Sequence, residues 1–147
     1  MKTTAIVARI LLGLIFTLFG LNGFLHFLQT PPPTGLGLQY FQVLSQSGYM
    51  TVVFFVQLVG GVLLLLGLYV PFALAILGPV IVNILTFHFL MNPEGLPLAL
   101  VVTVLWLFLA WAYRDYFRPL FTPRAVVREH SARGSSSSST APAASAS

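Results

Sequence analysis

The stretch "YMTVVFFVQLVGGVLLLLGLYVPFALAILGPVIVNILTFHFLM", residues 49–91, decides the fold. It holds two apolar runs, residues 49–68 and 70–91, each long enough as a helix to cross a hydrocarbon core of roughly 30 Å. The turn between them, near Leu68 to Pro71, is so short that the two helices must run antiparallel. Pro71 suits the first turn of the second helix, where its missing N–H costs little. The stretch therefore predicts a transmembrane helical hairpin.

Two further runs of the same kind flank this hairpin, at residues 4–28 and 96–113. The 147-residue chain is 57% hydrophobic and only 7% charged, whereas soluble domains carry about 25% charged residues. In lipid every backbone N–H must be bonded within its own segment, so each run is expected to be a helix. Short links, such as "NPEGLP" at 92–97, favour a compact bundle. The predicted fold is all-α, an integral membrane four-transmembrane-helix up-and-down bundle formed by residues 1–122.

The basic residues predict the orientation of this bundle. Lys2 and Arg9 lie at the start of the first span, and the other five basic residues lie at or after the end of the fourth: Arg114, Arg118, Arg124, Arg128 and Arg133. By the positive-inside rule both termini are expected in the cytoplasm. Charge beside helix ends indicates topology and contact with anionic membrane lipid, and no nucleic-acid partner is predicted. The first run exceeds the usual signal-peptide core of about 7–15 residues and precedes no small-residue cleavage site, so it is predicted to be retained.

Two segments lie outside the spans. In the first outer loop, "LGLQYFQVLSQSG" at 36–48 has apolar residues at helical spacing, which predicts a short interfacial helix; an irregular loop is the alternative. Residues 123–147 are rich in Ser, Ala and Pro and cannot bury enough apolar surface to fold. We expect them to form a disordered cytoplasmic tail that carries no chemistry, His130 included.

Five polar side chains interrupt the spans: Asn22, His26, Gln57, Asn83 and His88. Counting about 1.5 Å per residue places Asn22, Gln57 and Asn83 in one layer, about 18–20 Å above the cytoplasmic ends of three helices. His26 and His88 lie higher, about 24 and 27 Å up. Asn22 and His26 are four residues apart and are expected to share a helix face, whereas His88, five residues after Asn83, points away from it. The layer predicts a polar pocket in the outer half of the bundle.

Two interpretations of this layer stay open. Asn and Gln commonly hydrogen-bond across transmembrane helices, at about 0.6 kcal/mol on average, and histidines near the outer interface can simply be hydrated. Alternatively, Asn22, Gln57 and Asn83 bind the polar head of a small apolar ligand, and His26 or His88 exchanges a proton with it. All five residues are therefore ligand-binding candidates.

Several chemistries are excluded or disfavoured by residue types. The chain has no cysteine, which rules out disulfides and thiolate redox chemistry. Two histidines without a nearby carboxylate or thiol make a poor zinc site, so no metal is predicted. There is no Ser/His/Asp set, no phosphate-binding loop and no paired carboxylates, since Glu94 and Asp115 are expected at opposite membrane faces. Hydrolysis and phosphoryl transfer are therefore not expected.

Three segments carry a family resemblance. "ARILLGLIFTLFGLNGFLHF", "QLVGGVLLLLGLYVP" and "GPVIVNILTFHFLMNPEGLP", in this order, resemble the DoxX-like family of small four-helix bacterial membrane proteins over about residues 5–122. The resemblance implies four helices in the bacterial inner membrane. The family takes its name from relatives of a subunit of a thiosulfate:quinone oxidoreductase, and its members are often labelled oxidoreductases. Relatives often have an acidic residue where this chain has Gln57, a departure that removes an ionisable group from the predicted pocket.

The leading functional prediction is a quinone- or lipid-binding membrane component of an oxidoreductase or envelope redox system, with quinone as the candidate cofactor. The rival is a non-enzymatic membrane anchor or assembly subunit, or a homo-oligomer. In that case small-residue faces at Gly13, Gly20, Gly60 and Gly61 pack on a partner membrane protein. A transporter is a weaker third alternative, because four helices without buried charge could conduct only as an oligomer.

Overall fold

The computed structural model describes residues 1–29, 31–121 and 123. Every regular element in this part of the chain is helical, which confirms the all-α prediction there. The elements are α1 (Lys2–Leu25), α2 (Gly35–Gln46), α3 (Tyr49–Leu66), α4 (Val70–Leu90), the 3₁₀ turn η1 (Pro93–Gly95), α5 (Leu96–Ala112), α6 (Arg114–Phe117) and the 3₁₀ turn η2 (Arg118–Phe121). The tail predicted for residues 123–147 lies outside the described residues except for Pro123.

Four of these helices are long and apolar enough to cross a membrane, as predicted: α1, α3, α4 and α5 with its preceding 3₁₀ turn. The predicted limits of the second, third and fourth spans agree with α3, α4 and α5 to within two residues. The first span is shorter than predicted, because α1 ends at Leu25 and not near residue 28. The predicted interfacial segment is helical, as α2.

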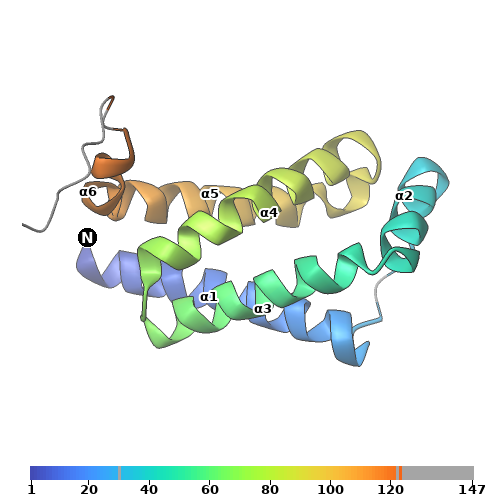
Figure 1. The fold of residues 1–147 in the computed structure, drawn as a ribbon, viewed down its shortest axis with the longest axis horizontal. Coiled ribbons are helices and arrows are strands. Elements are labelled where there is room, and N and C mark those ends of the chain that lie inside the picture. Colours follow the sequence, from blue (N-terminus) through green and yellow to red (C-terminus); the bar gives the residue numbers. More distant parts are fainter. Residues whose placement is uncertain (30, 122, 124–147) are drawn as a thin grey trace, which may run out of the picture.

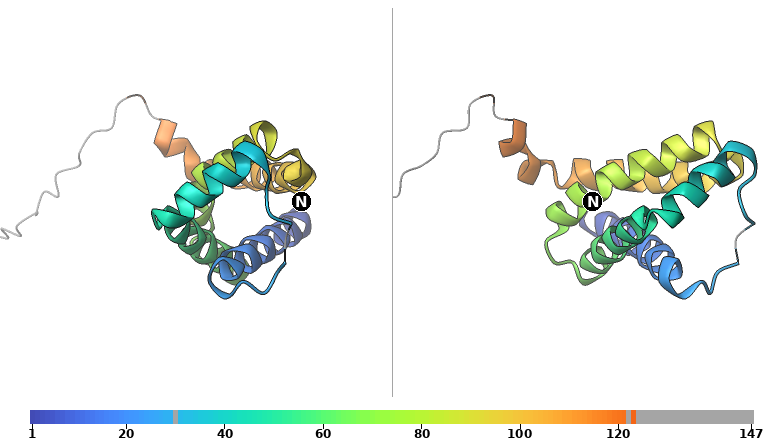
Figure 2. Two further views of the ribbon diagram at one scale, coloured as in Figure 1. Left: turned by 90° about the vertical axis from the view of Figure 1, so that its right-hand side faces the viewer. Right: turned by 45° about the vertical axis from the view of Figure 1, so that its right-hand side comes forward.

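The four long helices run alternately along one axis (Figure 1). Helix α1 packs on α3 and α5, and α4 packs on the same two helices, so the four close into a ring (Figure 2). The α2 end, as we call it, carries α2 and the α4–α5 turn, while the basic end carries the N-terminus, the α3–α4 turn and α6 (Figure 1). This is the up-and-down arrangement predicted from the short links.

The most extensive helix contact, between α1 and α3, is made through glycines. A Cβ at Gly13 would lie 3.0 Å from the Gly61 carbonyl oxygen, and one at Gly20 would lie 2.7 Å from the Leu58 nitrogen. A Cβ at Gly61 would lie 2.6 Å from the Thr17 nitrogen. Only residues without side chains allow two backbones to approach this closely.

The link between α3 and α4 is a tight turn built on left-handed backbone. Gly67 ends α3 with φ 71°, and Tyr69 precedes α4 with φ 48°. Pro71 lies in the first turn of α4, as predicted. The Arg9 guanidinium of α1 packs directly on Gly67 and leaves no room for a side chain there. The turn is therefore fixed by backbone conformation and by a contact from α1.

The side chains at the centre of the ring are apolar. The largest fully buried ones are Phe16, Leu12, Leu64, Leu74, Leu77 and Leu109. In each long helix, however, only 17–28% of the most apolar window is buried inside the molecule. Most residues in these windows are therefore half-buried or exposed, and they leave apolar surface on the outside of the bundle, as expected for helices in contact with lipid.

The glycine contact predicts that a Gly→Ala change lowers the free energy of unfolding, whereas helix propensity alone predicts that it raises it. Gly→Ala in a helix usually stabilises by about 0.5–1 kcal/mol. We expect Gly61→Ala to destabilise instead, by about 1–3 kcal/mol, because its methyl group collides with the α1 backbone. Reversible unfolding in mixed micelles measures the change.

Gly78→Ala is the matched comparison, because its Cβ would lie 3.2 Å from a side chain, the Trp106 ring, and would meet no backbone atom of another helix. We expect it to destabilise less than Gly61→Ala. A Gly61→Ala variant as stable as the wild type would contradict the close approach of α1 and α3.

Candidate functional site

Asn22 lies in the last turn of α1, and its side chain makes a hydrogen bond to the backbone just after that helix. Its Oδ1 accepts a hydrogen bond from the Leu28 N–H at 2.6 Å. His26 follows in left-handed conformation, with φ 51°, and its N–H donates to the Asn22 carbonyl. The prediction that Asn22 and His26 share a helix face is therefore wrong, because the helix ends between them and the His26 side chain is exposed.

Asn83 is bonded to a residue outside the predicted set. The Tyr40 hydroxyl of α2 donates to Asn83 Oδ1 of α4 at 3.0 Å. The Tyr40 ring also packs on Phe87, with ring centroids 5.5 Å apart, and Gly37 lies against the Met91 carbonyl oxygen. These contacts dock α2 onto the outer part of α4.

His88 faces the α4–α5 turn. Its Nδ1 lies 3.0 Å from the Asn92 carbonyl oxygen, which can only accept, so the ring donates this bond. The ring packs edge-on against Phe87 and covers Gly95. His88 and Asn83 therefore have different partners, in agreement with the prediction that they point apart.

Gln57 differs from the other candidates because it is the one buried polar residue in the described part of the chain, at 6% exposure. Its Oε1 is buried and has no hydrogen-bond partner. The hydroxyl of Thr17 on α1 is also buried and unpaired, and it lies over Gly61, one turn along α3 from Gln57. Three buried side-chain atoms in the described residues therefore lack a hydrogen-bond partner: Gln57 Oε1, Thr17 Oγ1 and Arg9 Nε.

In the described part of the chain, the five predicted residues are not linked to one another by hydrogen bonds. No hydrogen bond between described residues joins any two of Asn22, Gln57 and Asn83. Two polar residues near the candidates were not predicted from the sequence. Tyr40 bonds to Asn83, and Thr17 lies over Gly61, one turn along α3 from Gln57. For Thr17 the available signal was a hydroxyl four residues after Gly13 and three before Gly20, on the face that approaches α3.

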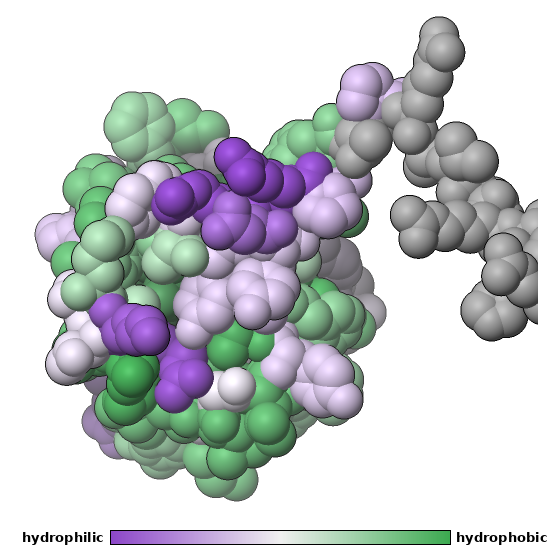
Figure 3. Space-filling model, turned by 90° about the vertical axis from the view of Figure 1, so that its left-hand side faces the viewer, coloured by the Kyte–Doolittle hydropathy of each residue, from purple (hydrophilic) through white to green (hydrophobic). Residues whose placement is uncertain are grey.

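Two hollows lie at the basic end of the described part of the chain. One, of about 360 Å³, is lined by Trp106, Ala110, Arg114, Phe117, Arg118 and Phe121. The other, of about 390 Å³, also includes Arg114 and runs along the first residues of α1. Figure 3 shows hydrophilic side chains gathered among apolar ones on this end of the molecule. The predicted outer pocket and the recorded hollows are therefore at opposite ends.

Four small residues that were predicted to meet a partner protein are used within the chain. Gly13, Gly20 and Gly61 lie between α1 and α3, and Gly60 faces the Leu77 side chain of α4. All four are buried. The prediction of a partner surface at these glycines is wrong, because the bundle itself covers them.

The described residues contain no group of three or more His, Cys, Asp or Glu side chains that could hold a metal ion. Comparison with known proteins matches the chain to no family model, no curated protein and no solved structure. Membership of the DoxX-like family therefore stays a prediction. The burial and hydrogen-bond partners of the candidate residues are what indicates a function.

The link between α2 and the bundle can be tested by a double-mutant cycle. We expect Tyr40→Phe and Asn83→Leu each to destabilise the docking of α2, with a coupling energy of about 0.5–1 kcal/mol from their shared hydrogen bond. Hydrogen exchange of the α2 amides provides the measurement. His26→Ala is the control, since that side chain is exposed; additive effects of the two variants would contradict the bond.

Proposed function

We propose that this protein is a multi-pass protein of the bacterial inner membrane, with both termini in the cytoplasm. It binds a small membrane-dissolved ligand that presents a hydrogen-bond donor to Gln57, and the ligand class is a quinol or a hydroxyl-bearing lipid. The observation that carries the proposal is the unpaired, buried Oε1 of Gln57.

The membrane orientation is supported by the distribution of charge. All four basic residues in the described part of the chain belong to the basic end: Lys2, Arg9, Arg114 and Arg118. The four long helices leave apolar surface on the outside of the bundle. Positive charge at one end of an apolar bundle favours placing that end at the cytoplasmic face.

The chemistry of the ligand follows from the atom left unpaired. A side-chain carbonyl oxygen is an acceptor only, so its partner must be a donor, such as the O–H of a quinol. The nearby Thr17 hydroxyl can donate or accept, which suits a ligand hydroxyl that does both. An unpaired buried acceptor costs about 1–3 kcal/mol, and a bound donor would recover that free energy.

The other four predicted residues favour binding over proton transfer. Asn22, Asn83 and His88 already make hydrogen bonds within the chain, and His26 is exposed. Gln57 would hold and orient the hydroxyl of the bound ligand. In the proposed assignment to the DoxX-like family, the chain is the membrane component of an oxidoreductase system.

Access to Gln57 requires a local rearrangement, because only 6% of this residue is exposed. Helix α2 contacts α3 and is attached to α4 through the Tyr40 to Asn83 hydrogen bond. Release of that bond would let α2 move away from α3, the helix that carries Gln57.

A binding experiment with the variant Gln57→Met tests the proposal. Protein purified from native membranes is analysed by mass spectrometry for retained quinones and lipids. We expect Gln57→Met to reduce retention of the ligand about tenfold, the loss of one hydrogen bond of about 1.4 kcal/mol. The ligand-free variant should at the same time be more stable than the wild type, because an unpaired buried oxygen has been removed.

Gln42→Met, on an exposed position of α2, is the matched control and should change neither quantity. Ligand-free wild-type protein with a stoichiometric partner would favour the anchor or assembly alternative. A Gln57→Met variant that is less stable and retains the same molecules would overturn the proposed site.

A further inference from the structure

The hollow of about 360 Å³ at the basic end combines an apolar floor with two arginines. Trp106, Ala110 and Arg114 are spaced four residues apart and follow one face of the chain from α5 into α6. Phe117 and Phe121 close the hollow from α6 and η2. The hollow therefore lies where the apolar part of the bundle meets its charged end.

The apolar floor is held in place by a bond between helices. The Trp106 Nε1–H donates to the Leu74 carbonyl oxygen of α4 at 2.9 Å. The same ring lies over Gly78, where an added Cβ would be 3.2 Å from it. The indole is thus fixed between α4 and α5, and it presents a rigid surface to the hollow.

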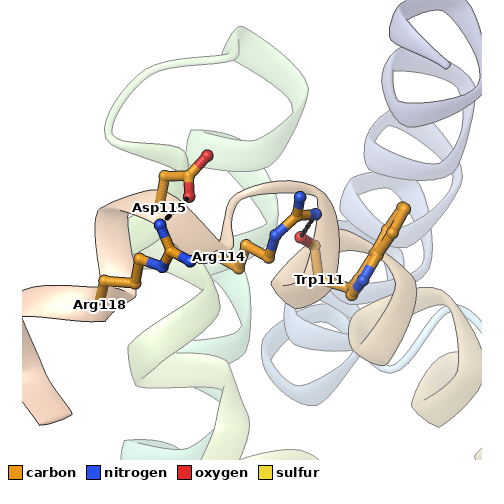
Figure 4. A network of polar contacts seen from close by, with 4 residues as sticks. All are labelled: Trp111, Arg114, Asp115 and Arg118. Carbon is orange, nitrogen blue, oxygen red and sulfur yellow. Dashed lines mark hydrogen bonds and ion pairs between the residues drawn. The ribbon is translucent and has the colours of Figure 1, made fainter.

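The two arginines differ in how firmly they are held (Figure 4). The Arg114 guanidinium stacks on the Trp111 ring, 4.8 Å from its centroid, and donates one bond to the Trp111 carbonyl oxygen at 3.3 Å. Arg118 pairs with Asp115 at 3.5 Å, with side chains 79% and 70% exposed. Exposed pairs of this kind contribute little, so Arg118 is free to exchange Asp115 for another anion.

Arg114 also lines the second hollow, which brings further positively charged groups near this arginine. Its lining includes Lys2 and the N-terminal Met1, which carries the α-amino group. Asp115 is the single acidic residue in the described chain near these groups, because Glu94 lies in the α4–α5 turn at the opposite end. The surroundings of Arg114 are therefore strongly cationic.

From this juxtaposition we infer that the hollow between α5, α6 and η2 binds one anionic phospholipid, with an acyl chain against Trp106, Ala110 and Phe117 and its phosphate on Arg114 and Arg118. The atoms that line the hollow are apolar, and the guanidinium groups of Arg114 and Arg118 make their contacts with Trp111 and Asp115. The occupant must therefore be apolar where it lies in the hollow and anionic where it meets these two guanidinium groups. A phospholipid of the cytoplasmic leaflet has this form and reaches the same depth as the arginines in the proposed orientation. The inference concerns the end opposite to Gln57 and does not depend on a ligand there.

Lipid retention in nanodiscs tests the inference. The full chain is placed in an equimolar mixture of phosphatidylglycerol and phosphatidylcholine, and native mass spectrometry counts the phospholipids that stay bound. We expect one phosphatidylglycerol per chain, and its preference over phosphatidylcholine should fall about fivefold for each of Arg114→Gln and Arg118→Gln. Added inorganic phosphate should not displace it, because phosphate lacks the acyl chain.

Two further variants separate a defined site from general attraction to a charged surface. Ala110→Phe fills the hollow without changing charge and should abolish retention. Asp115→Asn removes the anion that competes for Arg118 and should raise the preference for phosphatidylglycerol, a gain that misfolding cannot imitate.

The double variant Arg128→Gln with Arg133→Gln removes the same total charge at two positions that the inference does not use, and it is the matched control. It should retain the lipid. Equal losses of phosphatidylglycerol in this control and in the double variant Arg114→Gln with Arg118→Gln would overturn the inference. Full retention of the lipid by an Ala110→Phe variant that unfolds at the wild-type temperature would overturn it as well.

Discussion

The close approach of α1 to α3 is the constraint on which the rest of the structure depends. Glycines at positions 13, 20 and 61 bring two backbones together where any side chain would collide. In lipid there is no hydrophobic driving force between apolar helices, so packing at this distance supplies much of the association free energy. The Thr17 hydroxyl lies in this contact and is buried there without a hydrogen-bond partner.

Much of the fold follows from the sequence because a bilayer restricts the choices. Apolar runs of about 20 residues must be helices, and the prolines at 71 and 97 mark the starts of two of them. The end of α1 could not be predicted in the same way. The sequence stays apolar past Leu25, but the helix ends there. The Asn22 side chain accepts a hydrogen bond from the Leu28 N–H, and the His26 backbone is left-handed.

The hydrogen-bond partners of the candidate residues could not be predicted from the sequence. Heights along the helices predict one layer for Asn22, Gln57 and Asn83, yet height does not determine rotation or partner. Asn83 bonds to Tyr40, a residue of a loop helix whose docking depends on tertiary contacts. Of the five predicted residues, Gln57 alone combines burial with an unpaired atom, and this combination separates a binding group from a structural link.

Solid-state NMR of the wild-type protein tests the close approach of α1 and α3 most directly, because it adds no side chain to the contact. With ¹³C in glycine and ¹⁵N in leucine, a through-space cross-peak should join Gly13 Cα and the Leu65 nitrogen, since a Cβ at Gly13 would lie 3.0 Å from that nitrogen. Absence of this cross-peak would contradict the close approach of the two helices.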